Sequence, residues 1–367
     1  MSWLLIEAER IKLARLLGVP VAELDYLSRA SVAELRAVRE AVARSMVEED
    51  RALFGRLVAA TRLLPAAVVA TIAERVMGPM ICARVAGLMD PDQVIEVARR
   101  LSTPFLAEVC LHLDPRSAAA TLGRMPLPVI VAVAAELLRR GEYLTMARFV
   151  EFITDEAIAA VAKTMPDVAV LRVGFFVESR ERLNELVGLF DDRRIRSIIA
   201  TTAADPEQLW PQALTLMEQV GNESRGRLAR LGLAGQETIL VSLLQTANRT
   251  GLHEPLLTVL RGLDSTLVQR LGEYPLLADL DLIGPLFESA LRSESLGYLL
   301  PLAGALPEST RLALSEVLQR QPASRVQAVA RQLGQPLFAE RLRRDWSRLR
   351  PLLPRNWLPS LKDAGFD

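Results

Sequence analysis

The sequence predicts an all-α protein, and three observations lead to that prediction. Apolar residues recur every three or four positions along most of the chain, as in Val32, Leu35, Val38 and Val42, which is the period of a helix with one buried face. No strand-like alternation of useful length occurs. Half of the residues are hydrophobic but only 5% are aromatic, a composition typical of close helix-on-helix packing and not of a β-sandwich.

Two consecutive segments of the same design lie at residues 87–110 and 111–134. Each places Leu or Met before an Asp-Pro pair, continues with an apolar-periodic run and breaks at a second turn that contains proline. Aspartate is a good N-cap because its carboxylate accepts from the free N–H groups of the first turn, and proline there loses no hydrogen bond. We therefore expect two-helix units, with helices starting at the Asp-Pro pairs of Asp90 and Asp114.

Further copies of the unit follow along the chain. A third aligns from Ile153 and a weaker fourth from Phe190, and Asp205-Pro206 opens another helix. The intervals vary, so the repeat is degenerate. A single helical hairpin cannot bury its own apolar face, whereas hairpins stacked in line bury it for one another. The sequence predicts a right-handed superhelix, or α-solenoid, of degenerate two-helix repeats.

The same patterns divide the chain into four predicted regions. Ser31 and Glu34 have the spacing of a capping box, which predicts a helix over 32–46 in the first region. The regions are an N-terminal helical cap, a first repeat region, a second repeat region with turn signals every ten to twenty residues, and a C-terminal helix with an extended tail: residues 1–62, 63–210, 211–335 and 336–367.

The last region is rich in proline, tryptophan and arginine. Terminal repeats must cover their exposed face, so we expect this region to cap the last helices, with docking of another molecule as the open alternative. The residues in question are Trp346, Trp357, Arg341, Arg343, Arg344, Arg348 and Arg350.

Charge and hydropathy exclude several classes of partner. The 44 basic residues balance the 44 acidic ones, so no global field favours nucleic acid or an anionic membrane. Residues 13–27 have a helix-turn-helix pattern, but Glu23 and Asp25 stand where a DNA reader needs phosphate-binding side chains. The N-terminus lacks the basic flank of a leader, and the apolar runs 126–138 and 168–177 are shorter than the roughly 18 residues that span a bilayer. We expect a cytoplasmic protein that binds no nucleic acid and has no membrane span.

The repeat also has a pattern of its own, Leu-Asp-Pro followed by Ala, Leu and Met-Pro. Its residues in the second copy are Leu113, Asp114, Pro115, Ala119, Leu122, Met125 and Pro126. It recurs more loosely in the first and third copies, at Met89, Asp90, Pro91, Val97 and Leu101 and at Thr154, Asp155, Val161, Met165 and Pro166.

Over roughly residues 85–200 this pattern resembles the cytoplasmic N-terminal domain of MgtE-type magnesium transporters and the armadillo-like helical repeats of the flagellar motor switch protein FliG. The resemblance implies helical-repeat architecture. A transporter of that kind also carries nucleotide-binding-type and transmembrane domains, which we do not find in the sequence, so we do not expect the transporter itself.

The resemblance also implies magnesium sensing through surface carboxylates. Four acidic pairs are candidates: Asp90 and Asp92, Asp155 and Glu156, Asp191 and Asp192, and Asp279 and Asp281. A hard cation needs several oxygens converging on one point, whereas a carboxylate at a helix start is already explained by capping and by the helix dipole. We expect caps and assign no metal site, with weak magnesium binding between acidic turns as the open alternative.

Catalytic residue types are scarce. His112 and His253 are the only histidines, and Cys82 and Cys110 are the only cysteines. We interpret His112 as a buried or turn residue and the cysteines as reduced core thiols. No phosphate-cradling loop, dinucleotide fingerprint, paired-cysteine motif or nucleophile elbow occurs. We expect no catalytic residues, no cofactor and no enzyme activity.

A mean hydropathy of +0.22 is high for a chain of this kind. A single-file array buries a smaller share of its residues than a compact globule does, so part of this apolar content should line a groove or an end face. The sequence therefore predicts a non-enzymatic helical-repeat scaffold that binds another protein. The alternative is a divalent-cation-responsive regulatory protein related to the MgtE-type domain, with Mg²⁺ as the ligand.

Overall fold

The computed structural model confirms the all-α class. It describes residues 3–48, 51–61, 64–233, 237–333, 335, 338, 343, 349–350, 353 and 355–363. Within these residues every regular element is a helix, and no strand occurs.

The chain forms two compact units, Met1–Leu189 and Phe190–Asp367. Each unit is described by itself. The sequence places a boundary between residues 210 and 211, which lies inside a helix that runs from Pro206 to Gln219. The four predicted regions remain a prediction.

The first unit contains α-helices, one 3₁₀ helix (η1) and one π-helical turn (η2). In chain order they are α1 (Trp3–Leu17), η1 (Val21–Leu27), α2 (Val32–Glu48), α3 (Arg51–Thr61), α4 (Ala66–Ile72), η2 (Ala73–Met77), α5 (Gly78–Ala86), α6 (Pro91–Ala98), α7 (Thr103–His112), α8 (Ala119–Leu122), α9 (Leu127–Arg139), α10 (Tyr143–Phe149), α11 (Asp155–Thr164), α12 (Asp167–Phe176) and α13 (Arg180–Leu189).

The second unit continues in the same manner, with short helices and tight turns. Its described elements are α14 (Asp192–Ala204), α15 (Pro206–Gln219), α16 (Asn222–Leu233), α17 (Glu237–Thr250), α18 (His253–Arg261), α19 (Ser265–Gly272), η3 (Pro275–Ala278), α20 (Leu280–Arg292), α21 (Leu296–Ala305), α22 (Glu308–Gln319), α23 (Ala323–Leu333), η5 (Arg355–Trp357) and α26 (Leu358–Asp363).

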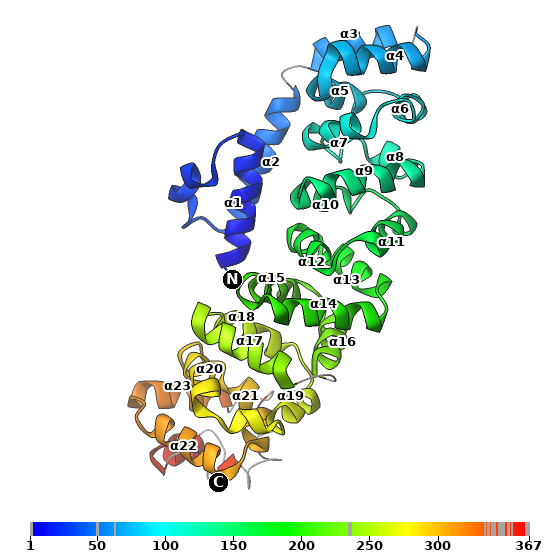
Figure 1. Ribbon diagram of the computed structural model, residues 1–367. Coiled ribbons are helices and arrows are strands. Elements are labelled where there is room, and N and C mark those ends of the chain that lie inside the picture. Colours follow the sequence, from blue (N-terminus) through cyan, green and yellow to red (C-terminus); the bar gives the residue numbers. More distant parts are fainter. Residues whose placement is uncertain are drawn as a thin grey trace. The chain divides into compact units, whose positions relative to one another are not determined.

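The first unit has two parts. Helices α1 and α2 pack on each other, and η1 packs on α1; we call residues 3–48 the N-terminal hairpin. The helices from α3 to α13, which we call the helix row, pack mainly on the second helix along the chain: α5 on α7, α7 on α9, α9 on α11 and α10 on α12. Figure 1 shows α1 and α2 side by side, alongside the helix row.

Several helix starts agree with the prediction. At the capping box, the Ser31 N–H donates to Glu34 Oε2 at 2.7 Å and the Glu34 N–H donates to Ser31 Oγ at 3.3 Å. Asp90 caps α6 as predicted, since its carboxylate accepts from the Asp92 N–H at 3.0 Å. Helix α15 begins at the predicted Asp-Pro pair, but the Asp205 side chain makes no capping hydrogen bond.

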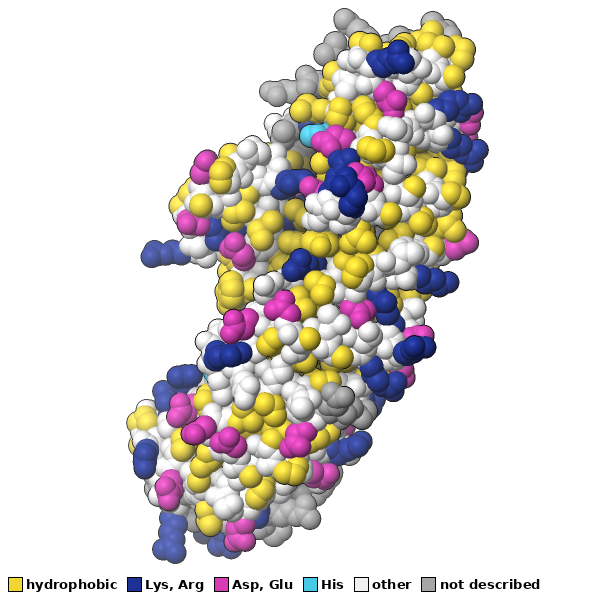
Figure 2. All heavy atoms as spheres, in the orientation of Figure 1, with side chains coloured by type: hydrophobic (Ala, Val, Ile, Leu, Met, Phe, Trp, Pro, Cys, Tyr) yellow, Lys and Arg dark blue, Asp and Glu magenta, His cyan; other side chains and the backbone are white. Residues whose placement is uncertain are grey.

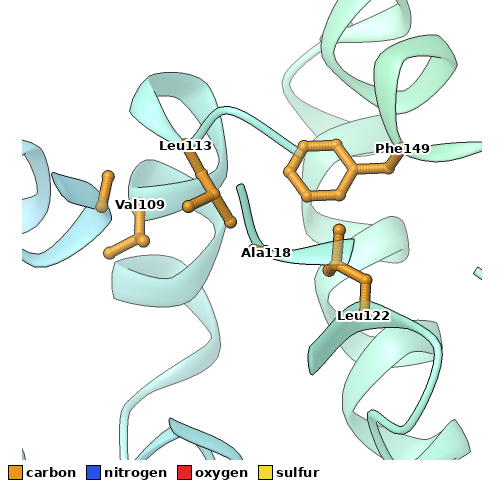
Figure 3. Close-up of a cluster of buried hydrophobic side chains, with 6 residues drawn as sticks. Val109, Leu113, Ala118, Leu122 and Phe149 are labelled. Carbon is orange, nitrogen blue, oxygen red and sulfur yellow. The ribbon is translucent and has the colours of Figure 1, made fainter. Parts of the chain in front are cut away.

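The predicted helix start at Asp114 is wrong. Residues 115–118 form a turn, and α8 begins only at Ala119. Leu113 and Ala118 are both buried in one core cluster with Phe149, and Figure 3 shows Leu113 and Phe149 converging on this cluster. A continuous helix would point residues 113 and 118 about 140° apart. The turn allows both to enter the same core, so packing overrides the local capping signal.

The extended tail is also a wrong prediction where the structure describes it. Arg355–Trp357 form the 3₁₀ helix η5, and Leu358–Asp363 form α26. Trp357 and Leu361, four residues apart, are fully buried, and α26 packs on α23. This burial agrees with a capping role for Trp357. Trp346 and Arg341, Arg344 and Arg348 lie outside the described residues.

Candidate functional site

Exposed apolar side chains gather on α3, α4, η2 and α5, at the beginning of the helix row. Val76 is 78% exposed and Met80 is 60% exposed. Figure 2 shows hydrophobic side chains over the region that Figure 1 labels α3 to α5. We call the exposed group the apolar patch; its residues are Leu57, Leu64, Val68, Val76, Met80 and Ile81.

Most of the patch belongs to one continuous helical stretch, Ala66–Ala86. Across the described ranges, this is the one helix whose length and composition would allow it to cross a membrane; its mean hydropathy is 1.5 and 22% of it is buried. The stretch differs from the apolar runs 126–138 and 168–177 that the sequence suggested, and it contains the charged pair Glu74 and Arg75. Length and composition do not separate a membrane span from a core helix, and the absence of a span stays a prediction.

Three of the carboxylates considered as magnesium ligands accept backbone hydrogen bonds as N-caps of helices. Asp191 accepts from the Arg194 N–H at 2.7 Å, and Asp279 accepts from the Asp281 N–H at 2.9 Å, as Asp90 does at α6. In the part of the chain that the structure describes, no group of three or more His, Cys, Asp or Glu side chains converges on a point. The expected capping role is therefore confirmed for Asp90, Asp191 and Asp279.

The acidic residues beside the caps pair with arginines further along the chain. Asp92 pairs with Arg124, Asp155 pairs with Arg182 at 2.6 Å, and Asp192 pairs with Arg227 at 2.7 Å. The cap of α11 is Thr154 and not Asp155: Thr154 Oγ1 accepts from the Ala157 N–H at 3.3 Å. The open hollow beside α11 and α13 is lined by residues already engaged in such contacts, including Asp155 and Arg182, so we assign it no ligand.

The two histidines lie in different units, and each is described by itself. His112, the last residue of α7, is exposed and directly precedes the loop and turn of residues 113–118, so of its two interpretations, buried or turn residue, the buried one is wrong. His253 is half-buried, and its Nε2 lies 2.9 Å from Asn248 Oδ1. Burial lowers the pKa of His253, and the nearby Arg292 acts in the same direction. This histidine is neutral at physiological pH and has a structural partner.

The two cysteines are free and pack against the core cluster around Phe149. Burial raises the pKa of Cys82 to about 11 and that of Cys110 to about 12. The thiolate is the reactive form of cysteine. Both thiols are therefore protonated near neutral pH, and neither has the environment of a catalytic nucleophile.

A cluster of ions joins the N-terminal hairpin to the helix row. We call it the ion cluster; it consists of Glu9, Lys12, Arg36, Arg39 and Glu178. Glu9 accepts from Lys12 Nζ at 3.1 Å, from Arg36 at 3.3 Å and from Arg39 at 3.2 Å. Glu178 accepts from Lys12 and from Arg39, both at 2.9 Å, and lies 3.7 Å from Arg36. Two carboxylates thus share the same three cations.

The ion cluster is shielded from water except at Arg36. The side chains of Glu9 and Lys12 are 3% and 8% exposed, those of Arg39 and Glu178 are 17% and 21% exposed, and that of Arg36 is 40% exposed. The sequence does not predict this cluster. One signal was available: Lys12 follows Leu4 and Ala8 at intervals of four residues, so a charge stands on a buried stripe of α1. The position of Glu178, far along the chain, had no such signal.

Comparison of the chain with protein families, curated proteins and solved structures finds no match. The class that the described residues define is an all-α protein, with an ionic junction between a hairpin and a helix row and an exposed apolar patch. The resemblance to MgtE-type and FliG-type repeats stays a prediction.

Proposed function

We propose that this chain is a non-enzymatic helical-repeat scaffold that binds another protein through the apolar patch. The observation that supports this most is the exposure of Val76 and Met80, at 78% and 60%, close in sequence to Leu64, Val68 and Ile81. Contact with water is unfavourable for such side chains, and large exposed apolar groups in soluble proteins are commonly interaction sites. Medium-sized apolar side chains with few charges among them suit a partner that offers its own apolar surface.

The proposed scaffold is a right-handed superhelix of degenerate two-helix repeats. Two features support the repeat. The helix row packs each helix mainly on the second one along the chain, as stacked hairpins would. Arg182 and Arg227 also make matching contacts at the starts of α11 and α14, through Asp155 and Asp192.

Solution scattering tests the proposed architecture. A compact globule of this length has a radius of gyration of about 21 Å. We expect a clearly larger value, because an array of stacked hairpins is elongated. A value at the compact limit would contradict the superhelix and leave the apolar patch to be tested separately.

The binding function is tested with a double variant, Val76→Glu with Met80→Glu. Both side chains are exposed, so the variant should fold, which circular dichroism verifies. The matched control is Leu312→Glu in α22, where the replaced leucine is 53% exposed and remote in sequence from the patch. Each form is immobilised and incubated with soluble lysate from the source cells.

The expected result is a specific protein that the unmodified chain and the Leu312→Glu control both retain and the double variant loses. Retention of the same proteins by all three forms would contradict a role for the apolar patch. Analytical ultracentrifugation of the unmodified chain is run alongside; a dimer that the double variant abolishes would show that the patch binds a second copy and not a different protein.

A further inference from the structure

We propose that the N-terminal hairpin is an intramolecular clasp, which the ion cluster holds on the helix row and which swings away as a folded body to uncover the C-terminal end of α12. This inference goes beyond the scaffold function, because it concerns a different surface and does not require the apolar patch to bind anything.

The hairpin has an interior of its own. Leu13, Ala14 and Leu24 are buried together, with Val19, Val21 and Leu27 packed around them. These residues come from α1, from η1 and from the turn between them. This cluster contains no residue of the helix row, and α2 joins this part of the hairpin by packing on α1.

Polar contacts within the hairpin strengthen the same unit. Arg10 donates to Glu7 at 2.7 Å, to the carbonyl oxygen of Val21 at 3.3 Å and to Asp25. One side chain thus ties η1 to α1. A segment with its own core and its own ties can keep its fold when it leaves the surface on which it rests.

The hairpin is joined to the helix row by ion pairs. Besides the ion cluster, Arg15 on α1 pairs with Glu142, just before α10, at 2.7 Å. Glu40 on α2 lies 3.4 Å from Arg116, in the turn before α8. Each of these contacts joins two charged side chains, and Figure 1 shows the blue hairpin alongside the helix row.

A shielded ionic junction behaves differently from an apolar one. Buried ions lose hydration, which offsets much of their attraction, so the junction fixes an orientation while adding little net stability. Removing one member, however, leaves the opposite charges only partly compensated, which is costly for those that are shielded. Without Glu178, the cations Lys12, Arg36 and Arg39 would share Glu9 alone. The complete ion cluster therefore keeps the hairpin on the helix row, and a change of one of its charges releases the hairpin.

The hairpin lies next to the C-terminal end of α12, a helix that has no exposed residue. Helix α12 carries two charged residues, Asp167 and Arg172, and none of its ten residues is exposed. Within the helix row it packs closely on α10, and a helix without an exposed residue is covered on more than one side. Glu178 follows α12 directly, after the buried residues Phe175 and Val177, so the ion cluster fixes the hairpin next to this end of α12.

Hydrogen–deuterium exchange of the full chain, read by mass spectrometry, tests the clasp. Glu178→Lys places a fourth cation in the ion cluster. We expect exchange of α1, α2 and α12 to become about tenfold faster or more, with the rest of the helix row unchanged. The matched control is Glu181→Lys, three residues further on, where the replaced side chain is exposed and lies outside the ion cluster.

A charge exchange separates the clasp from simple damage to the fold. Arg39→Glu combined with Glu178→Lys keeps two anions and three cations in the cluster, so we expect slow exchange to return. Three outcomes would overturn the proposal: unchanged exchange of α1 and α2 in Glu178→Lys, faster exchange across all of α3–α13, or no recovery in the double variant.

Discussion

Arg182 and Asp155 are 27 residues apart in the sequence and 2.6 Å apart in the structure. The same guanidinium donates to the carbonyl oxygens of Val150 and Ile153, each at 3.0 Å. A single side chain thus ties the beginning of α13 to the turn before α11. It also donates to Glu185 at 2.7 Å. The planar guanidinium thus serves four acceptors at once, which an ammonium group on a flexible stem does less well.

Arg227 repeats this arrangement in the second unit. It donates to Asp192 at 2.7 Å and to the carbonyl oxygen of Phe190 at 2.8 Å. In both units the arginine reaches the acidic residue after a helix cap and the carbonyl group before that cap. All but three of the 44 basic residues are arginines. At these two positions the arginine has a structural role, because it connects neighbouring helices.

The Arg182 contacts predict a large effect from a change that keeps the charge. Arg182→Lys should lower the free energy of unfolding by about 1–3 kcal/mol, because at least one carbonyl group or carboxylate loses its donor. Arg180→Lys, in the same helix at an exposed position, should stay within about 0.5 kcal/mol of the unmodified protein. Urea unfolding measures both, and equal stabilities for the two variants would contradict the assigned role of Arg182.

Two glycines in the second unit should respond in opposite directions to alanine. At Gly272 in α19, a Cβ would lie 2.6 Å from the carbonyl oxygen of Leu302 and 2.7 Å from the Cβ of Ala305, both on α21. The backbone of α19 or α21 has to move to make room, so Gly272→Ala should lower the free energy of unfolding by about 1–3 kcal/mol. At Gly226 in α16 the nearest atom is Nη1 of the flexible Arg230 side chain, at an ordinary contact distance of 3.5 Å, so Gly226→Ala should gain about 0.5–1 kcal/mol in helix propensity. Thermal unfolding measures both variants. Melting temperatures that shift in the same direction for the two would contradict this packing.

The sequence predicts local features better than distant ones. The Ser31–Glu34 capping box was predictable because both partners lie in one helical turn. The ion cluster was not, because Arg39 and Glu178 are 139 residues apart and helical period carries no information on which helices meet. The start at Asp114 failed for a related reason, since burial of its neighbours in the core decided the local conformation.

The apolar patch shows the same limit at the surface. Val76 and Met80 fall on an apolar-periodic helix, and periodicity treats every such position as buried. Their exposure depends on which neighbouring helices cover them, and that is a property of the assembled fold. The overall excess of apolar residues predicted that some surface of this kind exists, but not its location.

The magnesium alternative makes a prediction of its own. Because Asp90, Asp191 and Asp279 already accept backbone hydrogen bonds, millimolar magnesium chloride should leave the melting temperature unchanged. A site whose dissociation constant is one tenth of the magnesium concentration would add about 1.4 kcal/mol. Sodium chloride of equal ionic strength is the control. A shift specific to magnesium would favour the cation-responsive function over capping alone.

Acid should release the clasp, and the direction follows from the pKa of Glu178. Burial by itself would raise that pKa, but Lys12 and Arg39 outweigh the burial and hold the pKa below its usual range, and Arg36 acts in the same direction. The groups that face this carboxylate are Lys12 and Glu9 on α1, Arg36 and Arg39 on α2, and Arg148 on α10.

A carboxyl group whose pKa is lower in the folded state contributes stability above its unfolded pKa, about 4.3 for glutamate, and loses that contribution as the pH falls through the folded value. The contact of Glu178 is therefore complete at neutral pH and weakens as the pH falls below that unfolded value. Protection factors remove the intrinsic pH dependence of amide exchange and measure this directly. They should fall in α1 and α2 before they fall in α7 and α9.

In Glu178→Gln, which cannot ionise at this position, the two helices should already be less protected at pH 7, and their further loss on acidification should be smaller than in the unmodified chain. An equal loss in both forms would show that a different group controls the acid response.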